Sequence, residues 1–150
     1  MPDRGYRLPV MSELIRVDPR YPGAWATLEP YLAEALEKGN GTCDWLAEDI
    51  YVAAVENRIM LWALVDDGKV FGALATVVAG LPRRVLLEIL AMGADAHTED
   101  KWAGLLEQLK QYAAANGIHA IVGTGRPGWA RKLGATERRV FEIGVAPWAE

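Results

Sequence analysis

Hydrophobic positions change their spacing along the chain, and the change separates helices from strands. Between residues 22 and 38 the apolar residues recur every three or four positions, which predicts an amphipathic helix. Pro30 lies in this stretch and should break or restart the helix, because proline lacks the amide hydrogen that an interior turn needs. The stretch before it, 8–17, predicts one short strand at the edge of a sheet.

A second helix is predicted over 43–58, where apolar residues again recur at helical spacing. The glycines of the stretch 39–41 should end the first helix, because glycine readily adopts the left-handed conformation that closes a helix. Thr42 or Asp44 can then cap the second helix with a side-chain oxygen. Two helices are therefore expected before the first long strand.

Apolar runs without strict alternation follow, and they predict the strands of a meander. Residues 59–80 hold two such runs around Asp67-Gly68, a pair that accepts the positive φ angles of a tight hairpin turn. A turn at 81–83 leads to a third strand over 84–93. Because the runs barely alternate, other elements should cover both faces of the sheet.

The rest of the chain alternates helix and strand. Residues 98–116 predict the longest helix, with Thr98 as its N-terminal cap and Gly117 at its end. Three further elements are expected, namely a buried strand over 118–124, a short helix over 126–134 and a last strand over 136–145. The order (β)ααβββαβαβ predicts one domain over 1–150 of the mixed α/β class, with a largely antiparallel sheet flanked by helices.

Composition narrows the functional classes. The chain has 150 residues and a net charge of −4, which argues against nucleic-acid binding because that needs a basic surface. Cys43 is the one cysteine, and His97 and His119 stand in no metal-binding spacing, so neither a disulfide nor a metal site is expected. With no apolar stretch long enough for a membrane span and no signal peptide, we expect a cytoplasmic protein.

Three segments carry a family resemblance, and they are DDGKVFGALAT at 66–76, LLEILAMGA at 86–94 and IHAIVGTGRPGWARKLGA at 118–135. In this order, with a long amphipathic helix between the last two, they resemble the GNAT superfamily of N-acetyltransferases over residues 20–145. The nearest resemblance is to short GNAT-like proteins of tailed phages, which carry a Gly-Arg-x-Gly-Trp segment like residues 125–129. The resemblance implies a GNAT-like sheet and acetyl-CoA as co-substrate.

In this family a strand and the loop after it bind acetyl-CoA. The strand edge pairs with the pantetheine arm, and N–H groups of the loop face the pyrophosphate. The resemblance places the strand at 86–92 and the loop at 93–98. The residues that it implies for cofactor binding are Leu90, Ala91, Met92, Gly93, Ala94, His97, Thr98, Lys101 and Arg126.

The loop departs from the family pattern in its composition and charge. It holds one glycine instead of two or three, and acidic residues stand nearby at Asp95, Glu99 and Asp100. These carboxylates oppose the binding of a pyrophosphate, and His97 and Lys101 compensate in part.

Glu88 lies on the same strand, where many of these enzymes place a carboxylate that acts as general base. The resemblance therefore implies that Glu88 removes a proton from the acceptor ammonium, directly or through water, before the amine attacks the thioester. The alternative is that Glu88 faces solvent or pairs with Arg83 or Arg84.

The family often uses a tyrosine just before a Leu-Gly pair as general acid for the departing thiolate. Leu133-Gly134 matches that pair, but Ala130 stands at the position of the tyrosine, and no tyrosine occurs over 120–150. Trp129 cannot replace it, because an indole N–H has no useful acidity. The resemblance therefore supplies no general acid for the departing thiolate at this position.

Other polar residues have two interpretations each. Arg126, Arg131 and Lys132 form a basic cluster that either contacts a phosphate of CoA or is a solvated helix face. His119 lies in an apolar strand, which favours a core or edge position over the role of a base.

Two functions from different classes stay open. One is acetyl transfer from acetyl-CoA to a primary amine of a small molecule or a protein, with a strand N–H polarising the thioester. The other is a catalytically degenerate protein of this fold, a phage virion component that binds a protein partner or a second copy of itself. Pantetheine would need a slot, which requires that strands 86–92 and 118–124 do not pair along their whole length.

Overall fold

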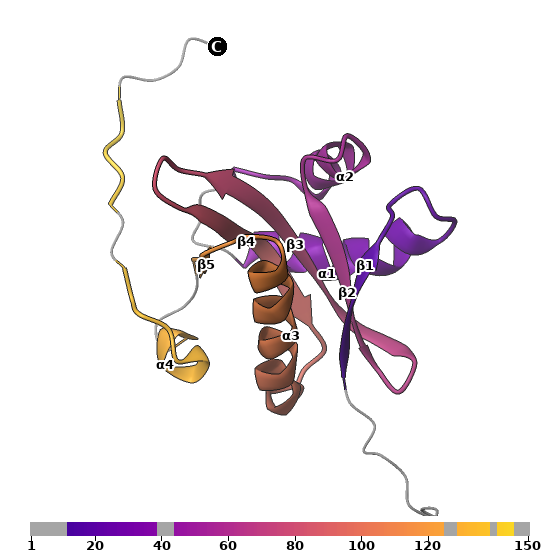
Figure 1. Ribbon diagram of the computed structural model, residues 1–150. Helices are drawn as coiled ribbons and strands as arrows, with labels where there is room; N and C mark the ends of the chain where they lie inside the picture. The colour runs from indigo at the N-terminus through magenta and orange to yellow at the C-terminus, as the bar shows by residue number, and fades with distance from the viewer. Residues whose placement is uncertain (1–11, 39–43, 125–128, 139–140, 146–150) are drawn as a thin grey trace, which may run out of the picture.

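The computed structural model describes residues 12–38, 44–124, 129–138 and 141–145. These residues build one 5-stranded sheet whose strands lie side by side in chain order (Figure 1). The strands are β1 (Glu13–Val17), β2 (Met60–Asp66), β3 (Lys69–Gly80), β4 (Val85–Ala94) and β5 (Ala120–Gly123). Neighbours are antiparallel from β1 to β4, and β5 is parallel to β4 because a helical crossover joins the two.

Helices cover both faces of the sheet, as the apolar runs predict. The helices are α1 (Ala24–Glu37), α2 (Ala47–Val55), the 3₁₀ turn η1 (Glu99–Lys101), α3 (Trp102–Ala115) and α4 (Trp129–Leu133). One core cluster joins α1 and α2 to one face through residues such as Leu28, Leu32, Ile50, Leu61 and Ala91. The other cluster joins α3 to the opposite face through residues such as Trp62, Leu64, Leu87, Leu105 and Leu109. None of the described helices is long and apolar enough to cross a bilayer.

The predicted hairpin and the edge strand are confirmed. Asp67 and Gly68 have φ angles of 51° and 76°, the positive values of a tight hairpin turn between β2 and β3. The N–H of Leu81 donates to the carbonyl of Arg84 at 2.8 Å and closes the turn between β3 and β4. β1 pairs with β2 at one edge of the sheet.

α1 runs through Pro30 without interruption, so the predicted break at that residue is wrong. Proline removes one N–H and leaves the carbonyl of Ala26, one turn earlier, without its helical partner. Pro30 and Ala26 are both exposed, so water can reach that carbonyl. Leu28 and Leu32 are 1% and 0% exposed, and the burial of this apolar stripe outweighs the local loss.

The second helix begins later than predicted, at Ala47, and neither proposed residue caps it. Asp44 is exposed and lies outside the helix, and Thr42 lies outside the described residues. Instead, the carboxylate of Asp49 accepts the N–H of Leu46 at 2.9 Å. A carboxylate inside the first turn also favours the helix dipole, so the helix starts where Asp49 can reach back.

The helix predicted over 98–116 also starts later than predicted, and with 14 residues α3 is as long as α1 and not longer. The run begins as η1 and becomes α-helical at Trp102, with no side-chain cap at Thr98. The Thr98 hydroxyl donates to the carbonyl of Asp95 at 2.8 Å, so it closes the preceding turn and does not accept a helical N–H. Gly117, with φ of 70°, follows the end of the helix as predicted.

The last predicted strand, over 136–145, does not form within the described residues of that segment. Phe141, Ile143 and Val145 are 83%, 75% and 90% exposed. The apolar alternation that predicts a strand is present, but none of the described strands lies beside it, and a lone extended segment has no partner for its backbone groups. Figure 1 shows this segment in yellow, outside the sheet.

Candidate functional site

β4 changes its pairing halfway along its length. Residues Leu86–Ile89 pair in parallel with Ala120–Gly123 of β5. From Leu90 to Ala94 the strand is hydrogen-bonded within the described chain only to β3. The strands at 86–92 and 118–124 therefore do not pair along their whole length, and part of the β5-facing edge of β4 has no strand partner among the described residues.

A β-bulge marks the point where the two strands part. Ala75 pairs with Ala91 and Thr76 pairs with Ile89, so Leu90 has no partner on β3. A bulge bends its strand and increases the local twist, and this bulge directly follows Ile89, the last residue of β4 that pairs with β5. No glycine or proline interrupts the apolar run here, so the sequence carries no signal for the bulge.

Glu88 lies one residue before the last pair between β4 and β5. Its neighbours across the strands are Val77 on β3 and Val122 on β5. Leu87 is buried in the cluster around α3, and alternation places Glu88 on the face that α1 and α2 cover. The Glu88 side chain is exposed, and within the described residues no ion pair joins it to Arg83 or Arg84.

Gly93 and Ala94 belong to β4, so the predicted boundary between strand and loop at residue 93 is wrong. Gly93 pairs with Ala73 and Ala94 pairs with Gly72. A Cβ atom at Gly93 would overlap the carbonyl of Tyr31, because the backbone of α1 crosses β4 at this point. Close packing of α1 thus explains this glycine, which the sequence pattern had placed in a phosphate-binding loop.

The loop that follows, Asp95–Thr98, is a tight turn held by three hydrogen bonds. The N–H of Asp95 donates to the carbonyl of Phe71 at 2.8 Å, and the Tyr31 hydroxyl donates to the Asp95 carboxylate at 3.0 Å. The Thr98 hydroxyl provides the third bond, to the Asp95 carbonyl. His97 is exposed and has a positive φ of 63°.

The backbone of this turn offers donors. Within the described chain, no acceptor is found for the N–H groups of Ala96 and His97. The helical run that begins at Glu99 adds the N–H groups of Glu99 and Asp100, whereas the N–H of Lys101 donates to the carbonyl of Thr98 at 2.9 Å. Successive free N–H groups at the start of a helical run form a setting that suits an anion.

Lys101 is engaged with the β2–β3 hairpin. Its ammonium lies 3.1 Å from the Asp66 carboxylate and 5.1 Å from the centre of the Phe71 ring. Ser12 donates a second bond to Asp66 at 3.0 Å. The hydrogen bond from Lys101, followed by that from Ser12, lowers the pKa of Asp66 below its ordinary value. The Asp66 carboxylate thus offsets the positive charge of Lys101, which the family resemblance implies for phosphate binding.

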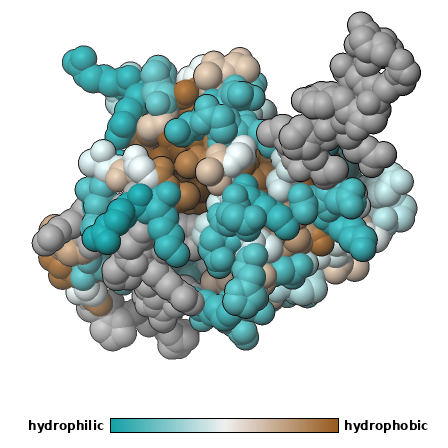
Figure 2. All heavy atoms as spheres, turned by 90° about the horizontal axis from the view of Figure 1, so that it is seen from below, coloured by the Kyte–Doolittle hydropathy of each residue, from teal (hydrophilic) through white to brown (hydrophobic). Residues whose placement is uncertain are grey.

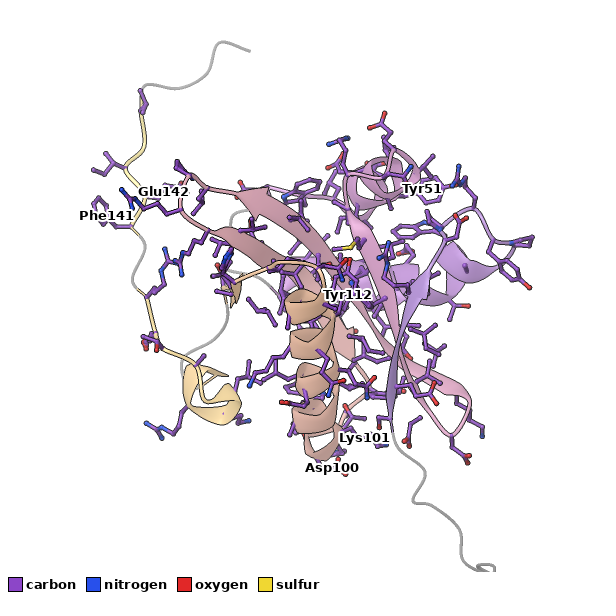
Figure 3. All side chains as sticks on the ribbon, viewed as in Figure 1. Tyr51, Asp100, Lys101, Tyr112, Phe141 and Glu142 are labelled. Carbon is purple, nitrogen blue, oxygen red and sulfur yellow. The ribbon has the colours of Figure 1, made fainter. Side chains whose placement is uncertain are left out.

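The acidic side chains near the turn differ in their partners. The hydrogen bond with Tyr31 occupies one oxygen of Asp95, and burial, followed by this bond, raises the pKa of Tyr31. Glu99 and Asp100 are exposed. Figure 3 labels Asp100 and Lys101 at the end of the molecule where α3 begins, and Figure 2 shows apolar atoms exposed between hydrophilic side chains at that end.

The remaining candidates lie apart from this turn or outside the described residues. Arg131 and Lys132 are exposed on α4, which fits the interpretation of a solvated face, and Arg126 lies outside the described residues, as does Cys43. His119 is an edge residue whose Nδ1 accepts the N–H of Val85 at 2.9 Å. Among the described side chains, no group of three or more potential metal ligands gathers.

Comparisons with known proteins add to this geometry. The sequence matches no family model, and no curated protein matches it. Among solved structures, an aminoglycoside acetyltransferase from an uncultured soil metagenomic sample, in complex with sisomicin, superposes with a TM-score of 0.68 at 14% identity. The match covers 91% of this chain and 97% of that chain.

Two further acetyltransferases superpose similarly. A second soil-metagenome aminoglycoside acetyltransferase gives a TM-score of 0.63 at 22% identity, over 90% of this chain and 99% of that chain. A predicted acetyltransferase from Clostridium acetobutylicum, solved with acetyl-CoA, gives 0.62 at 14% identity, over 89% and 96%. The chain therefore has the GNAT fold of these acetyltransferases, and the predicted fold class is confirmed.

Proposed function

We propose that this chain is an acetyl-CoA-dependent N-acetyltransferase. The observation that carries the proposal is that the pairing of β4 with β5 ends at Ile89 within the described residues, while β4 stays paired with β3 as far as Ala94. The unpaired edge over Leu90–Ala94 can hydrogen-bond the amides of an extended pantetheine arm, as a neighbouring strand would. The free N–H groups of Ala96 and His97 follow directly and can receive the pyrophosphate.

The proposed chemistry begins at Glu88. Its exposed carboxylate lies beside the point where the strands part, on the face covered by α1 and α2. There it takes a proton from the acceptor ammonium, directly or through water, and the neutral nitrogen forms a bond to the thioester carbon. A backbone N–H in Leu90–Met92 stabilises the developing oxyanion. The cationic nitrogen of this intermediate loses its second proton to water as the C–S bond breaks. The thiolate takes a proton from solvent, since no tyrosine occurs over 120–150.

The acceptor that suits this chain is a cationic primary amine, on a small molecule or a protein. The net charge of −4 and the exposed carboxylates of Glu88, Glu99 and Asp100 attract a cation. Two of the solved neighbours are aminoglycoside acetyltransferases, which is consistent with an amine acceptor. The need for acetyl-CoA places the proposed reaction in the cytoplasm.

A second candidate function is a GNAT-fold protein without catalysis, which binds a partner or assembles into a larger particle. The engagement of Lys101 by Asp66 favours it, because the turn then keeps the exposed Glu99 and Asp100 without that cation. The absence of a tyrosine over 120–150 favours it as well. None of the three solved neighbours described above is named as a phage protein, so the virion role stays a prediction from sequence.

The test of the first proposal is calorimetric titration with acetyl-CoA, with desulfo-CoA and ATP as competing probes. Submillimolar binding and turnover of a primary amine support the enzyme. Saturating acetyl-CoA at about 100 times its Kd should also add about 2.7 kcal/mol to the free energy of unfolding. If millimolar acetyl-CoA gives neither binding heat nor a thermal shift, the proposal of an acetyl-CoA-dependent enzyme is contradicted. Binding without turnover of any amine would support the second candidate.

A further inference from the structure

The backbone of Asp95 is fixed at the start of the turn by two hydrogen bonds, and only its side chain can change partners. Its N–H donates to the carbonyl of Phe71 at 2.8 Å, and its carbonyl accepts the Thr98 hydroxyl at 2.8 Å. Its exposed carboxylate accepts the Tyr31 hydroxyl at 3.0 Å. The partner of this carboxylate therefore determines where its negative charge lies relative to the free N–H groups of the turn.

An aspartate in a turn commonly takes a different partner. Its short side chain readily accepts the N–H two residues farther along the chain, which closes an Asx turn. Asp18 makes this bond in the present chain, and its carboxylate accepts the N–H of Arg20 at 2.9 Å. This bond, followed by that from the Arg20 side chain, lowers the pKa of Asp18. The corresponding donor for Asp95 is the N–H of His97, for which no acceptor is found within the described chain.

Tyr31 is fixed where its hydroxyl reaches Asp95. The backbone of α1 crosses β4 so closely that a Cβ atom on Gly93 would overlap the Tyr31 carbonyl. Leu28 and Leu32, on the same helix, are buried in the core and hold α1 against the sheet. Burial, followed by the bond with Asp95, raises the pKa of Tyr31, so the hydroxyl keeps its proton at neutral pH and stays a donor.

We propose that Tyr31 is a positioning residue, which holds the Asp95 carboxylate away from the N–H of His97 and so keeps the turn open for the pyrophosphate of acetyl-CoA. Without the Tyr31 hydroxyl, the carboxylate rotates to accept the N–H of His97, as Asp18 accepts the N–H of Arg20. It then occupies a donor that the pyrophosphate needs and brings a negative charge to it. The role in acetyl-CoA binding rests on the proposed function, whereas the choice of partner by Asp95 does not.

Amide hydrogen exchange of the ligand-free full chain, followed residue by residue by NMR, tests the choice of partner. In Tyr31→Phe the amide of His97 should exchange about fivefold more slowly than in the wild type, the factor that one hydrogen bond of ordinary net strength gives. In Tyr31→Phe/Asp95→Ala this amide should exchange as fast as in Asp95→Ala. A merely structural role would loosen the turn and speed the exchange. An unchanged or faster amide of His97 in Tyr31→Phe would overturn the proposal.

Calorimetric titration with acetyl-CoA tests the consequence for binding. Tyr31→Phe should raise the Kd about fivefold, whereas Tyr31→Phe/Asp95→Ala should match Asp95→Ala, because no carboxylate is left to compete. A weaker affinity that persists without the Asp95 carboxylate would overturn the proposal, as would a Tyr31→Phe variant with the wild-type Kd.

Tyr112→Phe is the matched control for the loss of a hydroxyl. It removes a bond to Met60 Sδ of 3.1 Å in the cluster around α3, and it should leave the Kd for acetyl-CoA and the exchange of the His97 amide unchanged. If the wild type does not bind acetyl-CoA, the proposed function fails, and the exchange of the His97 amide alone decides whether Tyr31 positions Asp95.

Discussion

The two halves of β4 are both mostly apolar but have different surroundings. Residues Leu86–Ile89 lie between β3 and β5, with strand partners on both sides. Residues Ala91–Ala94 follow the bulge at Leu90 and have a strand partner only on the β3 side within the described chain. The first half completes the sheet, and the second half leaves backbone groups available for another molecule. The comparison teaches that the candidate site arises where regular pairing stops, and not from a distinctive set of side chains.

The largest effect is expected from filling the space at Gly93. Gly93→Val places a side chain where the carbonyl of Tyr31 lies, so α1 must move off the second half of β4. The free energy of unfolding should fall by about 3 kcal/mol or more, measured by urea denaturation. Gly80→Val is the control, because a Cβ there meets nothing within 4 Å. Equal losses in both variants would show that α1 does not hold this half of the strand.

The second prediction concerns Glu88, which lies near the boundary between the two halves of β4. If Glu88 is the general base, Glu88→Gln should lower kcat/KM for acetyl transfer about 100-fold, because the ammonium acceptor is no longer deprotonated. The Kd for acetyl-CoA should stay unchanged. Glu107→Gln is the control, since Glu107 is exposed on α3 and away from β4. A Glu88→Gln enzyme with the wild-type rate and pH profile would remove Glu88 from the mechanism.

The next prediction concerns the negative charge beside the turn at 95–98, which follows the second half of β4. Glu99→Lys replaces a carboxylate beside the free N–H groups by an ammonium and should tighten acetyl-CoA binding about fivefold, equal to about 1 kcal/mol at low salt. Glu107→Lys makes the same change in net charge farther along α3 and should have no such effect. Calorimetry measures both. Equal tightening in the two variants would point to the overall charge of the chain and not to the turn.

The smallest effect concerns the bond that ties α1 to the turn. Tyr31→Phe removes the hydrogen bond to Asp95 and should cost about 1 kcal/mol at pH 7. The pKa of Tyr31 is raised above 10.0 in the folded protein, mainly by burial and then by Asp95, so its contribution is complete below pH 10 and is lost as the pH rises through the folded pKa. Urea denaturation at pH 7 and 11 should show the difference between wild type and variant shrinking. A constant difference would contradict this sign.

The fold was largely predictable because local chemistry determines much of it. Asp67-Gly68 determines the hairpin turn, and Gly117 follows the end of α3. Apolar runs without alternation predict a sheet that is covered on both faces. The predicted break at Pro30 was wrong because the carbonyl that loses its helical hydrogen bond lies on an exposed helix face, where water can reach it. The sequence does not show that this face is exposed. The strand predicted over 136–145 was wrong because alternation of apolar residues indicates a tendency to form a strand but not the presence of a neighbouring strand.

The site was less predictable, because long-range contacts build it. The bulge at Leu90 depends on the register with β3, and no residue type in the run announces it. Tyr31 meets Asp95, and Lys101 meets Asp66, across separations that only the packed sheet defines. The strand and loop were nevertheless placed near their observed positions, because the order of elements around them is specific to the fold.

Hydrogen exchange with and without saturating acetyl-CoA tests the central claim most directly, because it examines both halves of β4 in one experiment. The account predicts new protection over Leu90–Ala94 and at Ala96 and His97, with little change over Leu86–Ile89, which β5 already pairs. Protection that is absent, or confined to the first half of β4, would contradict the claim that the unpaired edge of this strand is the acetyl-CoA site.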